Sequence, residues 1–127
     1  MPTSDDLSYA RTAQLFADTG HFIYNGWATA MLGWQIVWGA LFIKLFGFSF
    51  LVLRASTILL AIASAVLLHR ILLRFGIEPR NAAFGTLIVI LCPQFLAETV
   101  SFMTDIPGVL CIFVCIYGLS ACPRRWQ

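Results

Sequence analysis

Apolar residues occur in long blocks along the chain, without the alternation of apolar and polar positions that is typical of half-buried strands. The longest block covers residues 48–73 and carries Arg54 near its start. Further blocks cover 81–101, which Pro93 is expected to kink, and 106–121. Because a helix needs about 20 mostly apolar residues to cross a bilayer, the blocks predict three transmembrane helices.

The first third of the chain has a different pattern. Residues 4–18 predict a short amphipathic helix, capped by Ser4 and ended by Gly20. Residues 28–46 predict a second helix, ended by Gly47, whose glycines, amides and tryptophans suit the headgroup region of a membrane. We therefore expect one or two interfacial helices before the spans. A fourth span over 28–46 is the rival interpretation.

Composition supports a membrane protein. The chain has 127 residues, of which 60% are hydrophobic and 11% are charged, whereas soluble domains have about 25% charged residues. The formal net charge of +2 gives no broad surface for nucleic acid. Motifs for nucleotide binding or a catalytic triad are missing. The cysteines lack metal-ligand spacing and are interpreted as small packing residues: Cys92, Cys111, Cys115 and Cys122.

Basic residues suggest an orientation in the membrane. They cluster after the first predicted span and after the last one: Arg70, Arg74, Arg80, Arg124 and Arg125. The positive-inside rule places both clusters in the cytoplasm. Residues 1–47 and the turn around Asp105 would then lie outside, so that Asp5, Asp6 and Asp105 share one face. If 28–46 crossed the membrane, the two N-terminal aspartates would move to the opposite side.

Two ionisable residues are predicted to lie within the outer part of the membrane. Glu98 and Arg54 sit at similar depth on neighbouring spans, where a charge is costly enough to suggest a functional role. A structural Arg54–Glu98 ion pair is one interpretation. The other is an outer cavity in which carboxylates take a proton or hold a metal and the guanidinium holds a phosphate.

Several short motifs, in this order, resemble a known family. They are Asp5-Asp6-x-x-Tyr9-Ala10, Leu45-Phe46-Gly47, Val52-Leu53-Arg54-Ala55-Ser56 and Met103-Thr104-Asp105-Ile106-Pro107. Together they resemble the N-terminal part of the polytopic GT-C glycosyltransferases, of the protein mannosyltransferase, aminoarabinose transferase or family 39 type. The resemblance implies a single fragment, residues 1–127, of a longer enzyme, inactive alone. Its departures are the missing helix before the acidic pair and Asn25-Gly26-Trp27 in place of a Glu-Lys-Pro-like stretch.

The resemblance also implies a reaction. Such enzymes transfer a sugar, with inversion, from a polyprenyl-phosphate donor to a lipid, glycan or protein acceptor at the extracytoplasmic face of the cell membrane. Asp5 corresponds to the general base, Asp6 to the second acid and Asp105 to the acid of the next external loop. Arg54 and Glu98 are candidates for binding the donor and its phosphate. No cofactor is certain; a divalent metal is left open, with Asp5 and Asp105 as its ligands.

Two other classes of function remain open at this point. A non-catalytic membrane subunit or scaffold would need Arg54 paired with Glu98 and no cavity. A transporter fragment would need polar residues along the first span, where only Thr57 and Ser64 occur.

Overall fold

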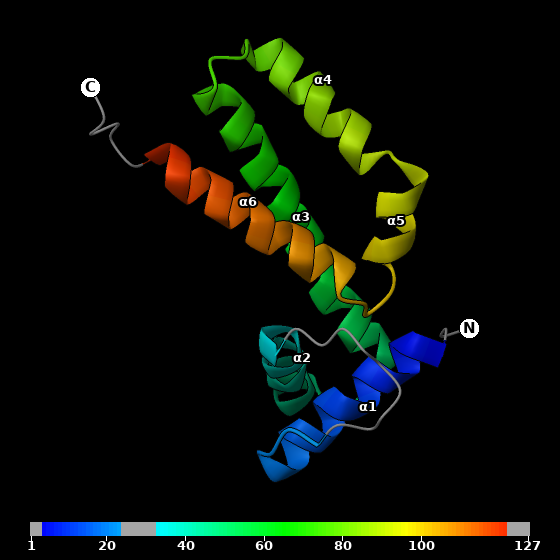
Figure 1. Cartoon of the computed structure of the whole chain (residues 1–127). Helices are drawn as coiled ribbons and strands as arrows, with labels where there is room; N and C mark the ends of the chain where they lie inside the picture. The colour runs from blue at the N-terminus through cyan, green and yellow to red at the C-terminus, as the bar shows by residue number, and fades with distance from the viewer. Residues whose placement is uncertain (1–3, 24–32, 122–127) are drawn as a thin grey trace.

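The computed structural model describes residues 4–23 and 33–121, and in these ranges the chain is all-helical, as predicted (Figure 1). The side chains of Ser4, Asp5 and Ala121 lie outside the description, as do Asn25-Gly26-Trp27, Cys122, Arg124 and Arg125. The helices are α1 (Ser4–Thr19), α2 (Gly33–Phe46), α3 (Phe50–Arg74), α4 (Pro79–Ile90), α5 (Pro93–Thr99) and α6 (Asp105–Ala121).

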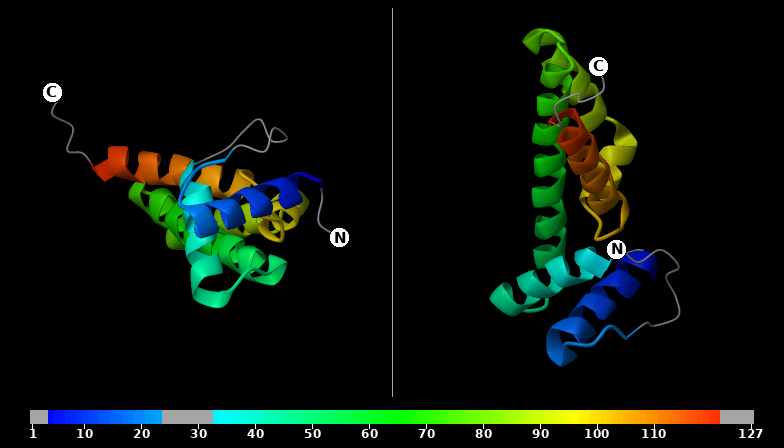
Figure 2. Two further views of the ribbon diagram at one scale, coloured as in Figure 1. Left: turned by 90° about the horizontal axis from the view of Figure 1, so that it is seen from below. Right: turned by 60° about the vertical axis from the view of Figure 1, so that its left-hand side comes forward.

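Helix α3 is the central element of the arrangement. It packs along α6 and also contacts α4, α5 and α2. Helices α1 and α2 pack on each other at the N-terminal end of α3 and lie crosswise to it (Figure 2). The chain therefore passes from a crosswise pair into helices that run along α3, which is the change of pattern predicted near residue 47.

The structure supports the prediction of three spans only in part. Among the described helices, α3 is the one long and apolar enough to cross a membrane, with 25 residues. Helices α4 and α5 pass the same test only as a pair, and they are bent by 65° at their break. Helix α6 is apolar but shorter. Length and apolarity therefore support one span, or two if the bent pair counts as one.

The bend between α4 and α5 has a local cause in the sequence. Pro93 has no backbone N–H and occupies the first turn of α5, so the helix of residues 81–101 is interrupted there. The predicted kink is therefore confirmed as a break. The helix starts two residues before the predicted block of 81–101, because α4 begins at Pro79 with Glu78 as its N-cap residue. A proline suits that first turn because its missing N–H would be unpaired there anyway.

The other helix ends follow the predicted stop signals. Gly20 and Gly47 have φ values of 72° and 81°, which residues with a Cβ rarely adopt. Their N–H groups donate to Phe16 O and Ile43 O at the ends of α1 and α2. Helix α3 begins two residues later than predicted, because the Ser49 hydroxyl accepts a hydrogen bond from the Leu51 N–H and caps the helix.

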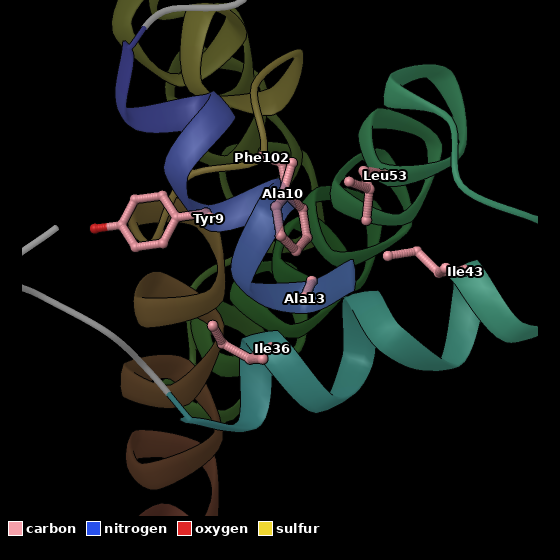
Figure 3. Packing of buried hydrophobic residues seen from close by; sticks show 7 residues of the cluster. All are labelled: Tyr9, Ala10, Ala13, Ile36, Ile43, Leu53 and Phe102. Carbon is pink, nitrogen blue, oxygen red and sulfur yellow. The ribbon is translucent and has the colours of Figure 1, made fainter. Parts of the chain in front are cut away.

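A buried cluster joins the crosswise pair to the rest of the molecule. Phe102, from the segment between α5 and α6, is 1% exposed and lies among side chains of α1, α2 and α3 (Figure 3). The cluster consists of Tyr9, Ala10, Ala13, Ile36, Ile43, Leu53 and Phe102. A second cluster, Leu60, Ala61 and Ile106, is covered by the partly buried Trp34 and Trp38. The tryptophans expected at headgroup depth thus also take part in packing.

Gly39 permits the close approach of Phe102 to α2. A Cβ at this position would lie 2.6 Å from Phe102 Cζ and 3.3 Å from Ala13 Cβ. Because the ring is enclosed on every side, it has little room to move away. We expect Gly39→Ala to lower the free energy of unfolding by about 1–3 kcal/mol through overpacking.

Gly118→Ala is the matched control, because a Cβ at Gly118 in α6 meets nothing within 4 Å. That change should be neutral or should stabilise the helix by up to ~1 kcal/mol. Reversible unfolding in mixed micelles, followed by circular dichroism, measures both variants. Equal stability of the two would show that Phe102 does not pack against Gly39.

Candidate functional site

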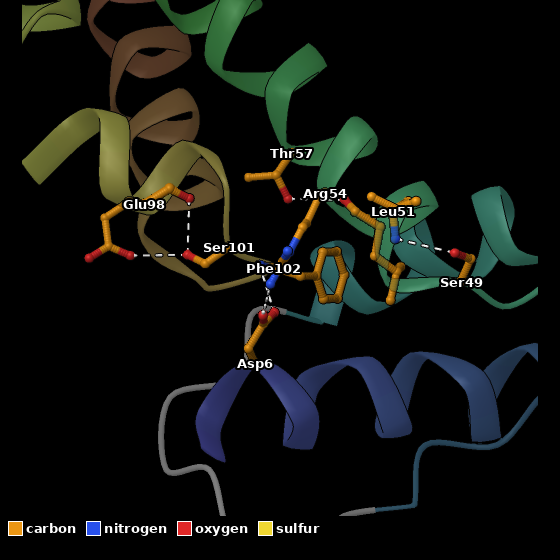
Figure 4. A network of polar contacts seen from close by, with 9 residues as sticks. Asp6, Ser49, Leu51, Arg54, Thr57, Glu98, Ser101 and Phe102 are labelled. Carbon is orange, nitrogen blue, oxygen red and sulfur yellow. Dashed lines mark hydrogen bonds and ion pairs between the residues drawn. The ribbon is translucent and has the colours of Figure 1, made fainter. Parts of the chain in front are cut away.

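The side chain of Asp6 connects three separate parts of the fold (Figure 4). Asp6 belongs to the first turn of α1, and the residue as a whole is 1% exposed. Its Oδ1 accepts a hydrogen bond of 2.8 Å from the Phe102 N–H, and its Oδ2 lies 3.6 Å from the Arg54 guanidinium on α3. A buried carboxylate is stable only when its oxygens have such partners. Asp6 is therefore committed to holding α1, α3 and the segment 100–104 together.

Arg54 is only partly used by this ion pair. Its side chain is 33% exposed, whereas that of Asp6 is 2% exposed. Its Nε is buried and has no hydrogen-bond partner within the described part of the chain. A guanidinium has five N–H donors, so the group retains donors for a further anion.

Glu98 does not pair with Arg54, and the predicted Arg54–Glu98 ion pair is wrong. The Glu98 carboxylate on α5 accepts a hydrogen bond of 2.7 Å from Gln94 Nε2 and lies 3.5 Å from Ser101 Oγ. Both partners are on or next to the same short helix. The reason is tertiary: α1 packs on α2 beside the N-terminal end of α3, and this places Asp6 Oδ2 3.6 Å from the Arg54 guanidinium.

Glu98 and Asp105 instead share a cavity between α4, α5 and α6. Its volume is about 480 Å³. Asp105 is exposed at the start of α6, and Glu98 is half-buried. The walls are otherwise mostly apolar, and the lining residues are Ile88, Val89, Cys92, Gln94, Phe95, Glu98, Asp105, Ile106 and Val109. This combination can enclose a partly apolar molecule and accept hydrogen bonds from its hydroxyl groups.

The predicted site residues thus fall into two groups. Asp6 and Arg54 are joined directly, while Glu98 and Asp105 line one cavity. Asp5 belongs to the first turn of α1, next to Asp6, and its side chain lies outside the described residues. In the described ranges no set of three or more His, Cys, Asp and Glu residues is arranged to hold a metal ion.

Sequence reasoning missed some participants and misplaced others. Nothing in the sequence indicated a role for the Phe102 N–H, because a phenylalanine is common in an apolar block. Gln94 could have been found from its spacing to Glu98, since residues four apart in a helix are neighbours. The cysteines are not packing residues where the structure describes them: Cys92, Cys111 and Cys115 are exposed. Cys111 and Cys115 lie on α6, whereas Cys92 lies between α4 and α5 and lines the cavity of Glu98 and Asp105.

Comparison with known proteins identifies the family. Residues 29–125 match the dolichyl-phosphate-mannose-protein mannosyltransferase family, which confirms the resemblance inferred from the motifs. The chain belongs to this family. No curated protein and no solved structure matches the chain.

The family match covers some of the candidate site residues but not all of them. The matched range includes Arg54, Glu98 and Asp105 and begins after Asp5 and Asp6. With the long apolar α3, the match makes the chain a membrane protein of glycosyltransferase type. A mannosyltransferase family of this description also implies a lipid-linked sugar donor.

Replacing Asp6 tests its connecting role. Asp6→Ala leaves the buried Phe102 N–H without an acceptor, which should cost about 1–3 kcal/mol of unfolding free energy. Asp6→Asn keeps an acceptor oxygen and should cost less. In a double-mutant cycle, Asp6→Asn and Arg54→Gln should show a coupling of at least ~0.5 kcal/mol. Strictly additive effects in chemical unfolding would mean that the two side chains do not interact.

Proposed function

We propose that this chain is part of a membrane glycosyltransferase that moves a sugar from a polyprenyl-phosphate donor to an acceptor of the cell envelope at the extracytoplasmic face. The observation that carries the proposal is the family match, together with the cavity that Glu98 and Asp105 share inside the matched range. The acceptor class, whether lipid, glycan or protein, is left to experiment.

The charges of the candidate site residues suggest separate binding places for the sugar and for the phosphate of the donor. Two carboxylates repel a phosphate, so the cavity is suited to the sugar, whose hydroxyls donate hydrogen bonds to Glu98 and Asp105. The phosphate is assigned to the exposed part of Arg54, which offers a fixed positive charge. This assignment refines the expectation that Glu98 and Arg54 bind the donor together.

In the proposed reaction Asp5 is the general base. It takes the proton from the acceptor hydroxyl while that oxygen attacks the anomeric carbon, and the bond to the lipid phosphate breaks with inversion. Arg54 offsets the negative charge that develops on the leaving phosphate. Asp6 acts as a positioning residue, because its hydrogen bond to Phe102 fixes the segment that leads into Asp105. Were a divalent cation to take part, Asp5 and Asp105 are the carboxylates proposed to hold it.

The proposed topology has three spans: α3, the bent pair α4 and α5, and α6. With 17 residues, α6 is at the lower end of the usual length for a span. Arg70, Arg74 and Arg80 lie around the α3–α4 connection, and the positive-inside rule assigns that end to the cytoplasm. Asp6, in the first turn of α1, and Asp105, at the start of α6, would then face outward.

A non-catalytic scaffold is the second candidate, and the complete burial of Asp6 favours it. The cavity with its two carboxylates counts against it, because packing alone needs no such space. Transport has less support. The Thr57 and Ser64 hydroxyls are buried and donate to Leu53 O and Leu60 O of their own helix, so they line no polar path along α3.

The topology is tested with single cysteines in the full-length protein after removal of the native cysteines. Leu7, Ile77 and Val100 are suitable positions, because they are 49%, 38% and 56% exposed. Asp6 is unsuitable, being buried. An impermeant thiol reagent on intact cells should label positions 7 and 100 but not 77. Labelling of 100 without 7, although both label in lysed cells, would place the acidic pair of α1 on the wrong side for the proposed reaction.

The proposed roles of the acids are tested in the full-length protein with labelled polyprenyl-phosphate mannose in membranes. Asp5→Asn should lower turnover at least ~100-fold through loss of the base, and Asp105→Asn should weaken it by a smaller factor. Asp18→Asn is the matched control, because Asp18 is exposed at the far end of α1. Wild-type turnover in Asp5→Asn would remove Asp5 from the mechanism, and wild-type turnover in Asp105→Asn would make it a simple turn residue.

A further inference from the structure

An open groove runs between α3 and α6, away from the residues assigned to glycosyl transfer. Its volume is about 510 Å³. Ala63, Val66, Leu67 and Arg70 line it from α3, and their spacing places them on one face of that helix. Leu110 and Tyr117 line it from α6. The two helices run side by side in the same direction, so Arg70 and Tyr117 mark one end and Ala63 and Leu110 the other (Figure 1).

The cationic end of the groove is held in place by a second arginine. The Arg74 guanidinium lies 4.0 Å from the centroid of the Tyr117 ring and donates to Tyr117 O at 3.3 Å. It also lies 3.4 Å from Ser120 Oγ. Arg74 is therefore occupied with the end of α6, where a positive charge complements the helix dipole.

Arg70 is differently placed. It is exposed, and within residues 4–23 and 33–121 no acidic side chain forms an ion pair with it. It thus presents an unneutralised positive charge at the mouth of a groove whose other lining residues are apolar, apart from Tyr117. Ala63 and Arg70 are seven positions apart along the helix, which gives the groove a length of about 10 Å.

We propose that this groove binds an anionic phospholipid, with its phosphate on Arg70 and part of one acyl chain along Ala63, Leu67 and Leu110. An apolar channel beside a membrane-embedded helix suits an acyl chain, and the unpaired guanidinium supplies the counter-charge for an anionic headgroup. A zwitterionic lipid has the same chain but no net charge to offer. The site lies at the opposite end of α3 from Arg54, so it is separate from the proposed transfer reaction.

The test uses the full-length protein in detergent, titrated with phosphatidylglycerol and followed by native mass spectrometry. Arg70→Gln should weaken phosphatidylglycerol binding by about fivefold, the effect of one basic residue near a lipid headgroup. Arg80→Gln is the matched control: Arg80 is an exposed arginine at the same end, stacked 5.9 Å from the Phe84 ring and not part of the groove. It should leave the affinity within twofold of the wild type.

A third variant tests the apolar part of the site. Ala63→Phe places a ring in the groove while keeping Arg70, and it should also weaken binding. Equal losses in Arg70→Gln and Arg80→Gln would overturn the proposal in favour of general surface attraction. So would unchanged binding in Arg70→Gln or in Ala63→Phe, equal affinity for phosphatidylcholine, or competition by glycerol phosphate as strong as that by the lipid.

Discussion

The buried carboxylate of Asp6 joins three parts of the chain, α1, α3 and the segment 100–104, by polar contacts. One oxygen accepts the Phe102 N–H and the other faces the Arg54 guanidinium. Because an unpaired carboxylate in this position would be strongly disfavoured, α1, α3 and the segment 100–104 are coupled to each other. The Phe102 ring reinforces the coupling by filling the space that Gly39 leaves on α2.

This coupling determines where the other acids lie. With the segment 100–104 tied to α1 and α3, α6 begins beside α5, and Asp105 faces the same cavity as Glu98. The acids of the chain thus have different environments. Asp6 is enclosed and fully used in packing, whereas Asp105 is exposed and Glu98 is held only by residues of its own helix region. The chemistry proposed for the site depends on this division.

Helix α3 separates two chemically distinct ends of the molecule. Near its start lie the acidic cavity and the Asp6–Arg54 pair, and near its end lie Arg70, Arg74 and Tyr117. Between them, the hydroxyls of Thr57 and Ser64 donate hydrogen bonds to backbone carbonyls of α3 itself. The middle of α3 therefore offers no free polar group to its surroundings. An apolar middle with a charged region at each end is the pattern expected of a helix in a bilayer.

The sequence by itself determined the membrane class, the family motifs and most helix ends. These follow from local properties: apolar block length, the left-handed conformation at Gly20 and Gly47, and the missing N–H of Pro93. It placed the start of α4 at residue 81, whereas the helix begins at Pro79. It predicted three spans, of which length and apolarity support one or two, because block length does not reveal a 65° bend.

Only the tertiary structure decided which acid pairs with Arg54 and which acids share a cavity. Periodicity places Arg54 and Glu98 at similar depth, but depth does not specify the direction in which each helix face points. Asp6 and the Phe102 N–H, which donates to it, are 96 positions apart in the sequence. A hydrogen bond between such distant residues depends on how the helices pack. Packing of whole helix faces, rather than any local preference, therefore placed the candidate site.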